Sequence, residues 1–147
     1  MRGMRPILLI EDEANDAMLV RETLAQLNLV NDVVIAGTAE IAKSAVKRDV
    51  PALIISDIYL AGRETGIDFL NWLRDQPPPL GNVPVIMMSV STEEVHHMRA
   101  SSLRALLFMT KPINQDVLLD QLRGLGLFVT HIPQGEQAAL MIEYRTH

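Results

Sequence analysis

The chain lacks cysteine, a surplus of basic residues and any long apolar run, and each absence excludes a class of protein. Without cysteine it can form neither a disulfide nor a thiolate metal site. There are 13 Lys and Arg against 18 Asp and Glu, and the formal net charge of −5 argues against a nucleic-acid surface, which needs a basic patch. The first apolar run, Ile7 to Ile10, is too short for a signal peptide or a membrane span. We therefore expect a cytoplasmic protein that binds neither nucleic acid nor a membrane.

The 147 residues, of which 48% are hydrophobic, are enough for a single domain with one core. Short apolar runs alternate with segments whose apolar residues follow helical spacing, and this strand-then-helix unit occurs five times. The expected strands are residues 7–10, 33–36, 53–57, 83–88 and 105–109. The alternation predicts an α/β fold, in which helices cover a doubly wound parallel sheet through right-handed crossovers.

Polar residues mark several of the expected helix ends. Thr38 and Thr92 are predicted to cap the second and fourth helices, and Asn114 is predicted to cap the fifth. The fourth helix should reach about Ser102, and the fifth should end at residues 124–126. Residues 127–147 then remain as a tail, in which a short helix is expected at 134–144.

Charged or hydroxyl residues lie at or just past the ends of four of the predicted strands. Because the carboxyl ends of parallel strands meet at one edge of a sheet, side chains far apart in the sequence should gather there. They are Glu11, Asp12, Asp57, Ser89 and Lys111. Crowded carboxylates repel one another, and a hard cation such as Mg²⁺ or Mn²⁺ removes that repulsion. Since an ammonium and a hydroxyl suit phosphate oxygens, the set describes a phosphoryl-transfer site with Asp57 as the nucleophile.

These five residues, each at its strand end and in this order, resemble the receiver domain of two-component response regulators. The resemblance covers roughly residues 5–125. It implies a flavodoxin-like sheet of strand order 2-1-3-4-5, a receiver domain at residues 1–126 and a C-terminal tail at 127–147. It also implies that the chain is not an enzyme in the ordinary sense, because it would catalyse only its own phosphorylation and dephosphorylation.

The resemblance assigns a role to each acidic residue. Asp57 would accept a phosphoryl group from the phosphohistidine of a sensor histidine kinase. Asp12, Asp57 and the backbone carbonyl of Tyr59 would hold Mg²⁺, with Glu11 acting mainly through water.

It also assigns the residues that hold the phosphoryl group and switch the domain. Ser89 and Lys111 would bind the phosphoryl oxygens, and the bond between Lys111 and Pro112 is expected to be cis. Phosphorylation would draw the Ser89 hydroxyl inward, and the ring of Phe108 would follow it. The face made by the fourth helix, fifth strand and fifth helix would then change shape for a protein partner.

Three residues depart from the usual family pattern. Ala61 stands where the family often has Pro, and Val90 replaces a small residue after the switch hydroxyl. Phe108 lacks the hydroxyl of the commoner Tyr. None of the three removes a reacting group.

The tail bears on the partners of the chain. Leu127 to Pro133 resembles the tail of single-domain response regulators that partner bacteriophytochrome kinases. Phe128, Val129 and Ile132 form an apolar cluster, from which we expect the tail to dock on a second copy in a symmetric homodimer. The homodimer could instead form through the face of the fourth helix, fifth strand and fifth helix, and the tail could fold back on its own domain. Output is expected through a downstream protein or phosphotransfer partner, since no DNA-binding or catalytic module follows the domain.

Other functions remain open on the same residues. A phosphorelay intermediate or a phosphate sink would use identical chemistry. A Mg²⁺-dependent phosphatase with an Asp nucleophile would usually carry a second Asp two residues later, where this chain has Tyr59. A flavin or nucleotide binder would want a Gly-rich or hydroxyl-rich loop after the first strand, and Glu11-Asp12-Glu13 occupies that place.

Overall fold

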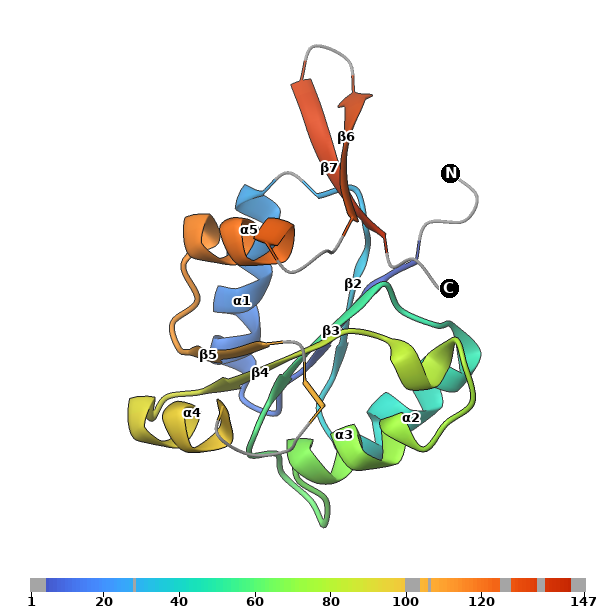
Figure 1. Cartoon of the computed structure of the whole chain (residues 1–147), viewed down its shortest axis with the longest axis vertical. Helices are drawn as coiled ribbons and strands as arrows, with labels where there is room; N and C mark the ends of the chain where they lie inside the picture. The colour runs from blue at the N-terminus through green and yellow to red at the C-terminus, as the bar shows by residue number, and fades with distance from the viewer. Residues whose placement is uncertain are drawn as a thin grey trace.

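A parallel five-stranded sheet forms the centre of the molecule in the computed structural model (Figure 1). The structure describes residues 5–27, 29–99, 104–105, 107–124, 128–134 and 137–143. The strand order is β2-β1-β3-β4-β5, and every neighbouring pair is parallel. The strands are β1 (Ile7–Ile10), β2 (Val33–Ala36), β3 (Leu53–Asp57), β4 (Val85–Ser89) and β5 (Leu107–Thr110). The predicted doubly wound, flavodoxin-like sheet is therefore confirmed.

Helices cover both faces of this sheet (Figure 1). They are α1 (Ala14–Gln26), α2 (Ala39–Arg48), α3 (Gly66–Arg74), the short 3₁₀ helix η1 (Leu80–Asn82), α4 (Thr92–Arg99) and α5 (Gln115–Gly124). Side chains alternate along a strand, so that Ile7 and Leu9 pack against α1 and α5 while Leu8 and Ile10 pack against the helices of the other face. Both faces of the central strands are thus buried, which is why their sequences are continuously apolar. None of the described helices is long and apolar enough to cross a membrane.

The helix caps agree with the sequence in two places and differ in one. Thr38 accepts the Ile41 amide at 3.1 Å, and Asn114 accepts the amides of residues 116 and 117 at 2.9 and 3.1 Å, as predicted. The prediction of Thr92 as a cap is wrong, because Thr92 is already the first residue of α4. Ser91 accepts the Glu94 amide at 3.1 Å in its place. The predicted helix end near Ser102 lies outside the described residues.

The tail forms a β-hairpin, and the helix predicted at residues 134–144 is wrong. Strands β6 (Phe128–Gln134) and β7 (Gln137–Glu143) pair antiparallel along their whole length. Although alanine, leucine and methionine favour helices, pairing with β6 satisfies the backbone of β7 and overrides that weak preference. The hairpin projects away from the main sheet, and β6 contacts α5 at its base (Figure 1).

The start of α3 packs directly against the end of β3. Thr65 and Asp68 form a reciprocal capping box, with hydrogen bonds of 2.9 and 3.1 Å between each side chain and the other residue's backbone amide. Gly66 donates its amide to the Ile58 carbonyl at 2.8 Å, and a Cβ at this position would collide with the carbonyl oxygen of Asp57. Only glycine allows the start of α3 to approach the Asp57 carbonyl this closely, and the contact holds the backbone of Asp57 in place.

Candidate functional site

The residues predicted at the strand ends lie along one edge of the sheet. Glu11 directly follows β1, Asp57 ends β3, Ser89 ends β4 and Lys111 directly follows β5. The register places Ile10 beside Ser56, Asp57 beside Met88 and Ser89 beside Thr110, so that the ends are level. The Lys111 amide also donates to the Ser89 carbonyl at 2.8 Å, which extends the pairing by one residue.

The ammonium of Lys111 lies at the centre of this edge. It donates to Asp57 at 2.7 Å, to Glu11 at 3.0 Å and to Asp16 at 3.0 Å, so that all three of its protons are used. Its side chain is only 9% exposed. Burial disfavours the charged ammonium, but the hydrogen bonds to Asp57, Asp16 and Glu11 outweigh it and raise the pKa of Lys111. The hydrogen bond from Lys111 in turn lowers the pKa of Asp16. Lys111 is therefore a fixed positive charge beside the Asp57 carboxylate.

Glu11 is the most deeply buried acid of the group. Its side chain has no exposed surface, and its Oε2 atom has no hydrogen-bond partner. Burial raises the pKa of Glu11 to about 8, and the neighbouring Asp57 contributes to the rise while Lys111 opposes it. A buried carboxylate oxygen without a partner indicates a place for a further positive group.

A divalent cation fits this group of acids. One carboxylate oxygen each from Glu11, Asp12 and Asp57 lies within 4.8 Å of the other two. Glu11, whose Oε2 atom has no hydrogen-bond partner, is one of the three acids, and Asp12 is exposed to solvent, from which a hydrated ion would enter. All-oxygen ligands with room for retained water suit Mg²⁺. The predicted role of the Tyr59 carbonyl stays a prediction; the Tyr59 amide donates to Asp57 at 3.2 Å.

The two predicted switch residues are both buried. Ser89 is 2% exposed, and its hydroxyl donates to Glu94 at 3.2 Å rather than into the group of acids. Phe108 is 6% exposed and packs in the core under α3 and α4. Its ring is thus already inside the molecule, and the expected inward movement stays a prediction. The bond between Lys111 and Pro112 is cis, as predicted.

A comparison with protein families identifies the family that has this fold. The model of the response regulator receiver domain matches residues 7–123. The chain belongs to this family. The match ends within α5, so the hairpin of β6 and β7 lies beyond the family's shared region.

Solved structures of the same family resemble this receiver domain closely. A bacteriophytochrome response regulator named RtBRR has 25% identity and a TM-score of 0.80, with 89% of this chain and 83% of that chain covered. A second one, AtBRR, has 26% identity and a TM-score of 0.80, with 90% and 99% covered. The chemotaxis response regulator CheY4 of Vibrio cholerae shares the fold, with 23% identity and a TM-score of 0.69. The match covers 84% of this chain and 99% of that chain. No curated protein matches the chain significantly.

Two acids at the receiver site were missed from the sequence. Asp16 lies in the first turn of α1 and accepts a hydrogen bond from Lys111. Glu13, three residues earlier, caps α1 by accepting the Asp16 amide at 2.9 Å. That spacing was the signal in the sequence for where α1 begins. Glu94 lies in the first turn of α4 and bonds to Ser89. The pattern Ser91-x-x-Glu94 is that of a capping box and could have shown where α4 begins.

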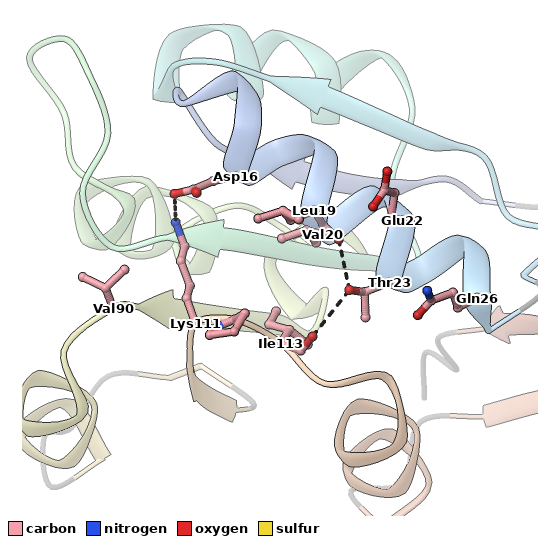
Figure 2. Close-up of a pocket in the computed structure, with 10 residues that line it drawn as sticks. Asp16, Leu19, Val20, Glu22, Thr23, Gln26, Val90, Lys111 and Ile113 are labelled. Carbon is pink, nitrogen blue, oxygen red and sulfur yellow. Dashed lines mark hydrogen bonds and ion pairs between the residues drawn. The ribbon is translucent and has the colours of Figure 1, made fainter.

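A cavity of about 520 Å³ opens beside the receiver site, between α1 and the segment from β5 to α5 (Figure 2). Lys111 lines it at the end nearest the site, where its ammonium meets Asp16 (Figure 2). Leu19, Val20 and Ile113 supply apolar walls. Leu19 is 55% exposed and Val90 at the rim 77%, so the cavity continues into an exposed apolar surface.

Proposed function

We propose that the chain is a stand-alone response regulator that accepts a phosphoryl group on Asp57 from a sensor histidine kinase, with Mg²⁺ bound by Glu11, Asp12 and Asp57. The observation that carries the proposal is the contact of 2.7 Å between the Lys111 ammonium and the Asp57 carboxylate, within the group of acids. A bacteriophytochrome is the proposed kinase, because two of the similar structures are named as bacteriophytochrome response regulators. A role as phosphorelay intermediate or phosphate sink would use the same chemistry.

The transfer follows from the arrangement of the side chains. An Asp57 carboxylate oxygen attacks phosphorus, the bond from phosphorus to the donor's imidazole nitrogen breaks, and the imidazole leaves with the electron pair. The product is an aspartyl phosphate. During transfer, Lys111 shares its protons between Asp57 and a phosphoryl oxygen. Its fixed positive charge there stabilises the negative charge that develops on the phosphoryl group. When bound, Mg²⁺ would supply the positive charge that offsets the carboxylates and the phosphoryl oxygens.

The surface beside the site supports a protein as the phosphoryl donor. The 520 Å³ cavity reaches from Lys111 to an apolar rim that includes Leu19 and Val90. Met18, which precedes Leu19 on α1, is 61% exposed. Large apolar side chains that cluster on a surface mark contact sites for other proteins. A helix carrying a phosphohistidine could pack here and present its phosphoryl group to Asp57.

Incubation with acetyl phosphate tests the proposal. We expect the intact mass to rise by one phosphoryl group in Mg²⁺ but not in EDTA, and we expect hydroxylamine, which cleaves acyl phosphates, to reverse the gain. Peptide mapping should place the group on the segment that contains Asp57. No gain in mass, or a gain that survives hydroxylamine, would reject the assignment. Steady release of free phosphate from many phosphoesters would favour the phosphatase alternative.

We propose further that the tail builds a homodimer. An isolated two-stranded hairpin is marginally stable in water, and among the described strands β6 and β7 pair only with each other. No third strand among the described residues pairs with either outer edge, and the two sequences include apolar residues such as Phe128, Leu140 and Ile142. A second copy would cover such a hairpin in a symmetric dimer.

Truncation after Gly126 tests the dimer. We expect light scattering to give two chains per particle for the full-length protein and one for the truncated protein, with the helical circular dichroism of the receiver domain retained. A full-length monomer would mean that the hairpin packs on its own domain. A truncated protein that stays dimeric would move the interface to the α4, β5 and α5 face.

A further inference from the structure

Glu94 bridges two loops at the receiver site. Its carboxylate accepts a hydrogen bond from the Tyr59 hydroxyl at 2.7 Å and a second one from the Ser89 hydroxyl at 3.2 Å. Tyr59 lies two residues after Asp57, and Ser89 ends β4. A single side chain on α4 therefore connects the residue that follows the phosphoryl acceptor with the hydroxyl expected to bind the phosphoryl group.

The N-terminus of α4 explains why the Glu94 carboxylate is available. In a complete capping box, the Glu side chain would accept the amide of the capping residue, here Ser91. Only one half forms: Ser91 accepts the Glu94 amide at 3.1 Å, while the Ser91 amide donates to the Ser89 hydroxyl oxygen at 3.1 Å. The carboxylate of Glu94 is thus left free to bind Tyr59 and Ser89.

The hydroxyl of Ser89 has only one proton to donate. Because that proton is directed at Glu94, Ser89 cannot donate at the same time to an oxygen of a phosphoryl group on Asp57. The two bonds to Glu94 differ in length: 2.7 Å is a strong hydrogen bond between oxygens, whereas 3.2 Å is long and easily broken. Tyr59 anchors the carboxylate, and the bond to Ser89 is the one that can exchange.

We propose that Glu94 is a positioning residue that holds the Ser89 hydroxyl away from Asp57 until a phosphoryl group competes for it. The inference rests on the proposed function, since it concerns the residue that binds the transferred group. It also connects the site to α4, because Ser89 cannot turn to the phosphoryl group without releasing that helix. The position of α4 would therefore report whether Asp57 is phosphorylated.

The rate of phosphorylation by acetyl phosphate in Mg²⁺ tests this role. We expect Glu94→Ala to raise the rate about three- to tenfold, the range for one long, weak hydrogen bond that no longer has to break. Glu94→Gln, which keeps a weaker neutral acceptor, should give an intermediate rate. Tyr59→Phe removes the anchor and should reproduce part of the increase. The matched control is Glu93→Ala, a neighbouring exposed carboxylate on the same helix, which should leave the rate unchanged.

A double variant separates positioning from simple charge. In a Ser89→Ala background, Glu94→Ala should add no further acceleration, because no hydroxyl is left to release. An increase that persists in that background, or that Glu93→Ala reproduces, would overturn the inference in favour of weaker repulsion of the anionic donor. If the wild-type protein is phosphorylated but the Glu94→Ala protein reacts no faster, the inference about Glu94 is wrong and the proposed function still stands. A wild-type protein that takes up no phosphoryl group overturns the proposed function as well.

Discussion

The Asp57→Asn variant should take up no phosphoryl group from acetyl phosphate while remaining folded. The amide of Asn is a poor nucleophile and cannot form an acyl phosphate, so the expected loss is complete within detection by intact mass. Asn keeps the shape of Asp, and the amide oxygen can still accept the hydrogen bond that Lys111 makes at 2.7 Å. The loss of reaction should therefore come without a loss of structure.

The stability of this variant gives a second measurement. Asp57 contributes to the rise in the pKa of Glu11, so that removing its charge relieves repulsion within the site. In EDTA we expect the free energy of unfolding in urea to stay the same or to rise by up to about 1 kcal/mol. Added Mg²⁺ should stabilise the variant less than the wild type, because one ligand is lost.

Asp49→Asn is the matched control for the same change of group. Asp49 is exposed and follows α2, at the opposite edge of the sheet from the site. Its replacement should leave both the uptake of phosphoryl groups and the response to Mg²⁺ unchanged. If the Asp57→Asn protein gained mass at the wild-type rate, another side chain would be the acceptor.

The fold and the main site residues could be predicted because both follow from the backbone pattern. Ile7 to Ile10 and Leu53 to Ile55 are continuously apolar since helices cover both faces of their strands. Once the strands are parallel, their carboxyl ends must share one edge, and Glu11, Asp57 and Lys111 meet there without any knowledge of side-chain rotamers.

The parts that were missed depend on choices between competing partners. Ser91 and Thr92 are both good caps, and only the position of the first helical turn decides between them. Asp16 and Glu94 sit in first turns, where an acid is usually explained by the helix dipole, so their bonds to Lys111 and Ser89 gave no separate signal. Similarly, β7 is helix-favouring in sequence and becomes a strand only because β6 pairs with it.

Replacing Lys111 with Met should impair both the stability and the reaction of the receiver domain. Met has a similar length but no charge, so Glu11, Asp16 and Asp57 lose their shared donor at once. In EDTA we expect the free energy of unfolding to fall by about 2–4 kcal/mol, below the figure for a fully buried pair because Asp16 is 38% exposed. Urea unfolding followed by circular dichroism measures this change.

The response to Mg²⁺ distinguishes the two roles of Lys111. A cation bound by the acids replaces part of the missing positive charge, and at about 100 times its dissociation constant it should restore up to about 2.7 kcal/mol of stability. It cannot replace the ammonium beside the phosphoryl oxygens, so the rate of phosphorylation should stay about 10²–10³-fold below that of the wild type even in saturating Mg²⁺.

Lys43→Met is the matched control, because Lys43 forms an ion pair of 2.7 Å with Glu64 away from the site. Both side chains of this ion pair are partly exposed. The free energy of unfolding should therefore fall by less than about 1 kcal/mol, and this loss should not depend on Mg²⁺. A Lys111→Met protein that recovered its reaction rate together with its stability would show that the ammonium acts only by holding the acids together. Stability restored without rate would instead assign Lys111 to the transfer itself, since the cation then satisfies the carboxylates while the phosphoryl oxygens still lack their donor.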